Sequence, residues 1–139
     1  MNNYYTYDFD YNYNNFDNYN QNNYNQIDPY KGFIRGNIFD NLYSPYKNYK
    51  PVEISPKNDK DYMMLMLQIY DFNLIDLNLY LDIYPNDTNM INLRNKYLND
   101  YKELKKSYET KYGAITTDST VLDKTPWGWI SPFPWEVDK

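Results

Sequence analysis

The sequence predicts a mainly α protein built on an antiparallel αα-hairpin, with a disordered Asn/Tyr-rich N-terminal arm and an extended Trp/Pro-rich C-terminal arm. Three observations lead to this fold class. Apolar residues recur at helical spacing in the middle of the chain, a proline-centred turn divides that region, and the compositions of both ends oppose regular packing. We divide the chain into an arm (1–30), a linker with a motif (31–60), the hairpin (61–113) and a tail (114–139).

The first long helix is predicted from residue 61 up to Pro85. Ser55 or Asn58 can cap its start, and the acidic Asp59 and Asp61 suit the positive end of the helix dipole. Pro85 ends the helix because proline cannot continue it. One apolar stripe alternates steps of four and three residues and is made of Met63, Leu67, Tyr70, Leu74, Leu77, Leu81 and Tyr84.

The second long helix follows a short turn in which Asn86, Asp87 or Thr88 can serve as the N-cap, and Gly113 ends it. Its apolar face contains Leu93, Tyr97, Tyr101, Leu104, Tyr108 and Tyr112. Because the connection is short, the two helices should be antiparallel neighbours. We expect the following residues at their interface: Leu74, Leu77, Leu81, Tyr97, Tyr101 and Leu104.

A second apolar stripe lies roughly opposite the first on the first helix. Two helices can cover only one stripe of each other, so the second needs the chain's own arms, a second copy, or another protein. Asp76 lies beside this stripe; we interpret it mainly as a solubilising residue, with a buried contact to a partner as the alternative. The stripe, a candidate partner-binding surface, consists of Leu65, Ile69, Phe72, Leu79 and Ile83.

Residues 1–30 are almost entirely asparagine, tyrosine and aspartate, with no lysine or arginine before Lys31. This segment has almost no aliphatic surface to bury, so we expect it to be disordered on its own. Asparagine with regularly spaced aromatic residues is also typical of self-associating segments. The arm is therefore either a solubilising tail or a self-associating arm whose tyrosines can be oxidatively cross-linked.

Residues 31–60 contain the stretch "GFIRGNIFDNLYSPYK", which is too apolar for a free linker. Gly36 and Pro45 exclude one long helix through it.

The tail "TPWGWISPFPWEVDK" contains every tryptophan of the chain. Its prolines favour an extended, polyproline-like path, on which tryptophans are pre-ordered contact residues. These side chains either bind a partner or fold back over the second stripe. The candidate partner-binding residues here are Trp127, Trp129, Pro132, Phe133, Pro134 and Trp135.

Composition excludes most catalytic sites. The chain has no histidine and no cysteine, so the commonest general base, the commonest metal ligand and thiolate chemistry are absent. Asp71 and Asp76 are five residues apart and do not share a helix face. The net charge of −5 disfavours nucleic acid as a partner, and aspartates interrupt the apolar run 62–84 at every depth, which disfavours a membrane span. We therefore expect no enzymatic activity and no cofactor.

Three stretches together resemble the CotJB family of spore coat proteins: "DFNLIDLNLYLDIYPND", "KYLNDYKELKKSYETKYGAIT" and "PWGWISPFPWE". The resemblance covers roughly residues 62–137. The chain departs from the family pattern at Tyr84, where a histidine is usual, at Ala114, where a proline is usual, and at Phe133, where a tryptophan is usual. Separately, "GFIRGNIFDNLYSPYK" resembles a segment of the short CotJA coat protein.

The resemblance implies a structural component and assembly adaptor of the spore coat, made in the mother-cell cytoplasm during sporulation. It implies other coat proteins as partners, including a CotJC-like manganese catalase, and self-association is a further possibility. Metal and catalysis would then belong to the catalase-like partner. The alternative is a small helical regulatory module that sequesters a partner helix.

Overall fold

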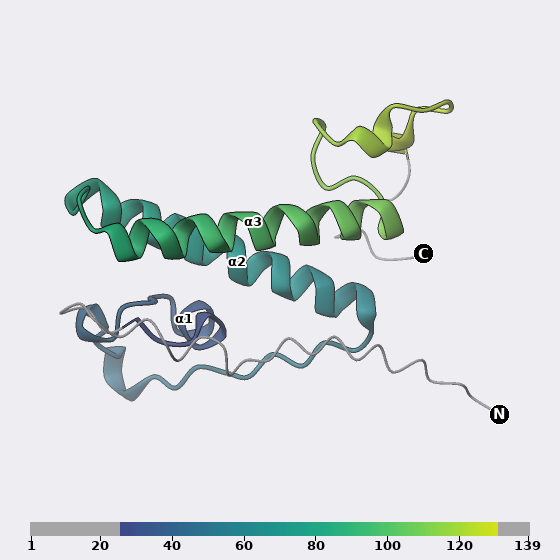
Figure 1. Ribbon diagram of the computed structural model, residues 1–139. Helices are drawn as coiled ribbons and strands as arrows, with labels where there is room; N and C mark the ends of the chain where they lie inside the picture. Colours follow the sequence, from purple (N-terminus) through teal and green to yellow (C-terminus); the bar gives the residue numbers. More distant parts are fainter. Residues whose placement is uncertain (1–25, 131–139) are drawn as a thin grey trace.

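The computed structural model describes residues 26–130 and confirms the mainly α fold with its helical hairpin. Figure 1 shows α2 between α3 on one side and the layer formed by residues 26–58 on the other. Residues 1–25 of the predicted N-terminal arm and residues 131–139 of the tail lie outside the described residues. The described helices are α1 (Pro29–Arg35), η2 (Asp40–Leu42), η3 (Tyr46–Asn48), α2 (Asp59–Ile83), α3 (Thr88–Tyr112), η4 (Thr120–Leu122) and η5 (Gly128–Ile130).

The ends of the two long helices are set by the residues that the sequence indicates. The Asn58 side chain accepts the backbone N–H of Asp61 at 2.8 Å and caps α2. Asp87 caps α3 by accepting the N–H groups of Asn89 and Met90. Gly113 follows α3 with a φ of 105°, a backbone conformation that favours glycine. Local turn chemistry therefore fixes where the hairpin begins, turns and ends.

The interface between α2 and α3 is the predicted one. Leu74, Leu77, Tyr97 and Leu104 are buried, and Leu81 and Tyr101 pack half-buried against the same core cluster. The rings of Tyr70 and Tyr97 meet edge to face with centroids 5.7 Å apart. Large aromatic side chains at helical spacing thus fill the space that smaller aliphatic residues occupy in many hairpins.

A charged cluster joins the open end of the hairpin. Asp59, in the first turn of α2, accepts a hydrogen bond from the Lys111 ammonium at 2.6 Å and another from the Tyr112 hydroxyl, both at the end of α3. The hydrogen bond from Lys111, followed by that from Tyr112, lowers the pKa of Asp59 below its ordinary value of 3.8. Both Asp59 and Lys111 remain partly exposed, so water screens the pair.

The acid stability of the hairpin should depend on this cluster. A carboxylate whose pKa is lowered by folding stabilises the folded state above the unfolded pKa of 3.8, and that contribution disappears as the pH falls through the folded value. We expect Asp59→Asn to lower the melting temperature at pH 7 and to leave it nearly unchanged near pH 2. Asp71→Asn, at an exposed site of α2, is the matched control. An equal loss for Asp59→Asn at both pH values would contradict this role.

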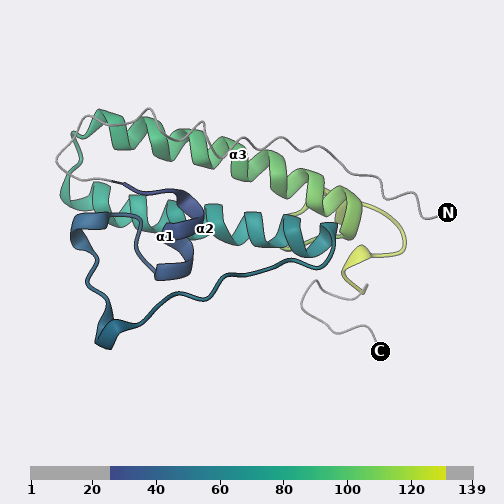
Figure 2. The ribbon, with the colours of Figure 1, turned by 90° about the horizontal axis from the view of Figure 1, so that it is seen from below.

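Residues 26–39 cover part of the second stripe of α2 (Figures 1 and 2). Asp28 caps α1 by accepting the N–H of Lys31, and Pro29 occupies the first helical turn. Ile38 and Phe39 are fully buried. The boundary placed at residue 30 from composition falls inside α1, because the cap and proline that begin this helix belong to a stretch that otherwise reads as low complexity.

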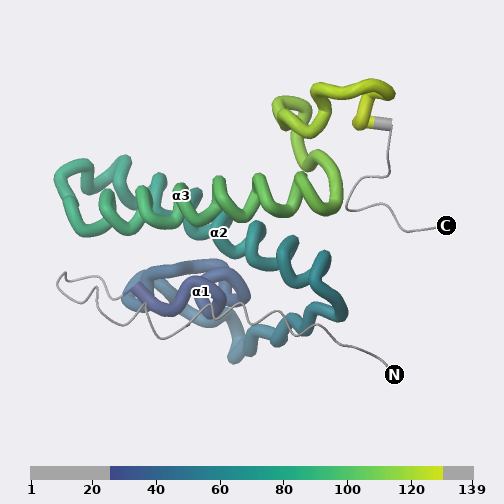
Figure 3. Tube along the Cα trace, turned by 45° about the vertical axis from the view of Figure 1, so that its right-hand side comes forward, coloured from purple at the N-terminus to yellow at the C-terminus, as the bar shows by residue number. Residues whose placement is uncertain are grey.

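The described part of the tail folds beside the end of α3 (Figure 3). The buried Glu109 carboxylate accepts the N–H of Ile115 at 2.9 Å, and the Lys105 ammonium donates to the Thr116 hydroxyl at 2.7 Å. Leu122 in η4 is buried. These contacts place Trp127 and Trp129 near the open end of the hairpin and away from its turn.

Candidate interaction surface

Three large aliphatic side chains form an exposed strip on the C-terminal half of α2. Ile75, Leu79 and Ile83 follow each other at steps of four residues, so they lie on one helix face. Their exposed fractions are 53%, 60% and 71%. Isoleucine and leucine are seldom so exposed in consecutive helical turns unless another surface covers them. We call these three residues the aliphatic strip.

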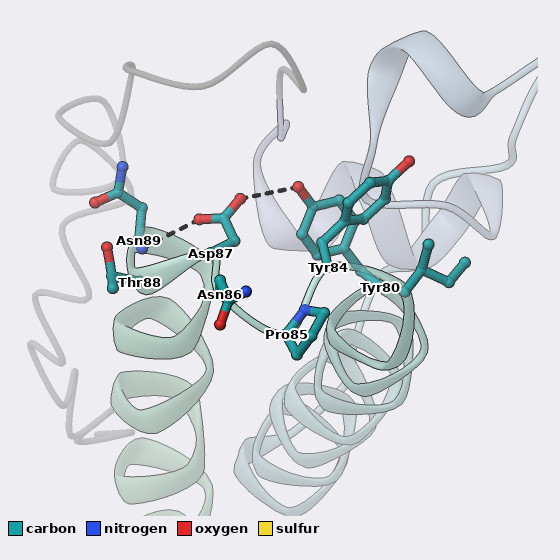
Figure 4. Close-up of a pocket in the computed structure, with 8 residues that line it drawn as sticks. Tyr80, Tyr84, Pro85, Asn86, Asp87, Thr88 and Asn89 are labelled. Atoms are coloured by element: carbon teal, nitrogen blue, oxygen red, sulfur yellow. Dashed lines mark hydrogen bonds between the residues drawn. The ribbon is translucent and has the colours of Figure 1, made fainter.

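The aliphatic strip reaches a hollow at the turn of the hairpin, because Ile83 belongs to both. The hollow has a volume of about 480 Å³. Its wall comes from the end of α2, the turn and the first residues of α3, as Figure 4 shows. The lining residues are Tyr80, Ile83, Tyr84, Pro85, Asn86, Asp87, Thr88 and Asn89. An apolar strip beside a polar hollow is an arrangement typical of protein interfaces.

The Asp87 carboxylate in this hollow is already used by the fold. One oxygen caps α3, and the other accepts the Tyr80 hydroxyl at 2.9 Å (Figure 4). The Tyr80 ring in turn lies 4.8 Å from that of Tyr84 and stacks on Phe39 at 4.7 Å. The helix cap and the packed rings therefore fix the shape of the hollow, and the Asp87 carboxylate stabilises the fold.

The N-terminal part of the predicted second stripe does not lie on a free surface. Leu65 and Ile69 are buried in the core, and Phe72 packs edge to face on Phe33 with ring centroids 5.9 Å apart. Asp76, interpreted as solubilising or as a partner contact, accepts the N–H of Ile38 in the same chain at 2.8 Å. Residues of the same chain therefore cover this part of the stripe, which is one of the covers that the sequence leaves open.

The C-terminal part of that stripe is exposed. Leu79 and Ile83 belong to the aliphatic strip, since residues 26–39 extend along α2 only as far as the Phe39–Tyr80 contact. In the tail, Trp127 is 53% exposed and Trp129 is half-buried. Trp129 lines a hollow with the end of α3 and η4. Pro132, Phe133, Pro134 and Trp135 lie outside the described residues.

One important residue was not singled out by the sequence. Asn73 is fully buried, and its side-chain amide donates to the carbonyl oxygens of Pro29 and Ile69 at 3.0 and 2.7 Å. A buried polar group needs such partners to offset its lost hydration. The sequence gives one indication of this role: by helical spacing, Asn73 lies between the two apolar stripes.

The described residues contain neither a candidate metal site nor a candidate membrane helix. Within residues 26–130, no three of histidine, cysteine, aspartate or glutamate come together in a way that could hold a metal ion. No helix of this same range has the length and apolar character needed to cross a membrane.

Comparison with known proteins gives one match. The family model described as CotJB protein matches residues 61–136. This range contains α3, nearly all of α2, the whole aliphatic strip and most of the tail. No curated protein and no solved structure matches the chain. Tyr84, which lines the hollow at the turn, lies within the matched range. Because the match covers more than half of the sequence, the chain belongs to the CotJB family and is a spore coat-related protein.

Proposed function

We propose that the protein is a structural component and assembly adaptor of the spore coat, without catalytic activity of its own. The observation that supports this most is the aliphatic strip, a preformed apolar face on a rigid helix. A hairpin with a packed core has no need for three exposed aliphatic residues in a row, whereas a binding face does. The strip also lies inside the region that the family model matches.

The partner that the family resemblance implies is a manganese-catalase-like coat protein. The described residues of this chain present apolar surface and packed polar groups, which suit contact better than chemistry. The exposed Trp127 offers a second contact near the other end of the hairpin. We further propose synthesis in the mother cell, followed by incorporation into the coat, with the tyrosine-rich N-terminal arm (1–30) contributing to an insoluble layer.

A charge in the strip should separate binding from folding. Leu79→Asp places a carboxylate where the side chain is 60% exposed. The helix propensity of aspartate and the like charges of Asp76 and Asp82 should lower the free energy of unfolding by no more than about 2 kcal/mol, which leaves the domain folded. Binding should weaken by at least about ten-fold, because the charge would have to be desolvated in the interface. Co-purification with the catalase-like protein from sporulating cells measures this. The tryptophan fluorescence, which reports on the tail alone, tests whether that segment also leaves water.

The matched control is Asn78→Asp, which adds the same charge one residue away. Asn78 is exposed and accepts the Arg94 guanidinium at 3.1 Å, a contact that aspartate retains. This variant should co-purify like the wild type. Normal coat incorporation of Leu79→Asp, or equal loss in both variants, would remove the strip from the adaptor function.

A further inference from the structure

Residues 26–40 are linked to one another by hydrogen bonds and an ion pair of their own. The Ile27 N–H donates to the Ile38 carbonyl at 2.9 Å, which joins the two ends of the segment, and Arg35 pairs with Asp40 at 2.7 Å. Gly36 turns the chain with a φ of 85°. A Cβ at Gly32 would lie 3.1 Å from the Ile38 Cα, so α1 and the returning chain touch through a glycine. We call residues 26–40 the docking unit.

The docking unit is seated on α2 by a small, specific set of contacts. Ile38 and Phe39 supply the buried apolar surface, being 0% and 2% exposed. Two hydrogen bonds fix the register: Asp76 accepts the Ile38 N–H at 2.8 Å, and Asn73 donates to the Pro29 carbonyl at 3.0 Å. The hydrogen bonds inside the unit do not involve α2. Undocking would therefore break these contacts and leave the unit's own hydrogen bonds intact.

Residues 41–58 connect the docking unit to α2, and nearly all of them are exposed. The connector runs beside α2 toward its first turn (Figure 2). From the level of Tyr80 back to Asp59, α2 rises by about 32 Å. Eighteen extended residues can span about 60 Å, nearly twice that distance. The connector is also tied to the docking unit, because the Tyr30 hydroxyl donates to the Glu53 carboxylate at 2.6 Å and accepts the Ile54 N–H at 2.9 Å. Once these two hydrogen bonds are released, a connector of this length can also reach the α2 of a neighbouring molecule.

The family match adds an independent observation. It begins at residue 61, so the docking unit and the connector both precede the matched region. The surface of α2 that receives the unit lies within that region. The docking unit thus lies outside the matched region, although its Ile38 and Phe39 belong to the same buried core cluster as the hairpin residues.

We propose that, when copies are crowded, the docking unit of one chain binds the α2 surface of a second copy. Docking within a chain and docking between chains make the same contacts, so concentration decides between them. The surface on α2 and the unit are different patches, and their exchange joins copies head to tail, either in closed rings or in open-ended chains. This exchange goes beyond the adaptor function and does not need the catalase-like partner.

Two single-cysteine chains test the proposal directly, since the protein has no cysteine of its own. Phe33 and Phe72 are half-buried neighbours across the docking contact. Full-length Phe33→Cys, enlarged by a tag, is mixed with full-length Phe72→Cys and treated with a short thiol cross-linker. We expect a mixed dimer whose yield rises with protein concentration. Adding Ile38→Asp to the tagged chain should reduce that yield by at least about ten-fold, because the new charge would be buried on docking.

The controls decide between the two kinds of docking. Asn99→Cys, exposed on α3, replaces Phe72→Cys in a parallel mixture and reports random collision. The double variant Phe33→Cys/Phe72→Cys should cross-link within one chain at low concentration, which shows that the substitutions preserve docking. A mixed dimer no more abundant than the Asn99→Cys background at the highest soluble concentration would overturn the proposal. So would a double variant that fails to cross-link. Neither result would touch the adaptor function, because no other coat protein is present.

Discussion

Replacing Leu77 by aspartate should strongly destabilise the hairpin. Leu77 is 0% exposed at the centre of the interface between α2 and α3. The substitution removes a buried leucine side chain and leaves a carboxylate without a partner, so the free energy of unfolding should fall by at least about 4 kcal/mol. Domains of this size have a total stability of about 5–15 kcal/mol. The melting temperature should therefore fall by at least about 15 °C.

Far-ultraviolet circular dichroism and urea titration measure this effect, and Ile75→Asp is its matched control. Ile75 lies two residues away on the same helix but is 53% exposed. The same charge should change the free energy of unfolding there by less than about 1 kcal/mol. Similar melting temperatures for Leu77→Asp and the wild type would mean that α2 meets α3 through another face.

The hairpin was predictable because its determinants are local. Caps, the Pro85 turn and the spacing of leucine and tyrosine all act within a few residues, so a single sequence records them. The structure moves the start of α2 only to Asp59, next to the Asn58 cap. Burial of Leu74, Leu77 and Tyr97 follows from the same periodicity.

The cover of the second stripe was not predictable, because it depends on residues far apart in the chain. Spacing along a helix compares Asp76 only with its neighbours, whereas its hydrogen-bond partner is the N–H of Ile38, 38 residues upstream. Asn73 likewise contacts Pro29, 44 residues away. The apolar spacing predicts that another segment must cover the second stripe. It does not predict which segment does so, or where that segment ends along α2.

The aliphatic strip lies where the docking unit no longer covers α2. The docking unit reaches Tyr80 through Phe39 and stops there. Leu79 and Ile83, on the adjacent face, consequently stay exposed together with Ile75. The stripe that the sequence treats as uniform thus divides into a buried structural part and an exposed binding part, and only the second remains a candidate partner surface.

Replacing Ile38 by aspartate should detach the docking unit and leave the hairpin folded. Ile38 is 0% exposed, and its N–H donates to Asp76, so the introduced carboxylate would be buried close to an existing one. Loss of apolar contact and like-charge repulsion act together, and docking should weaken by at least about 3 kcal/mol. Ile38 belongs to the same buried core cluster as Leu77 and Tyr97. The helix caps and the Tyr70–Tyr97 ring contact do not involve Ile38, so most helical dichroism should persist.

Protease sensitivity of the connector and thiol reactivity of a cysteine at Phe72 measure the detachment, and both should increase. Burial and the nearby Asp76 should raise the pKa of the introduced carboxyl, so its charge, and with it the defect, should diminish as the pH falls from 7 toward 4. Leu42→Asp is the matched control, because Leu42 lies just beyond the docking unit and is 56% exposed. If Ile38→Asp lowers the melting temperature of α2 and α3 as much as Leu77→Asp does, the docking unit is part of one indivisible core. Exchange of that unit between copies would then require unfolding of the whole domain, which a long connector alone cannot bring about.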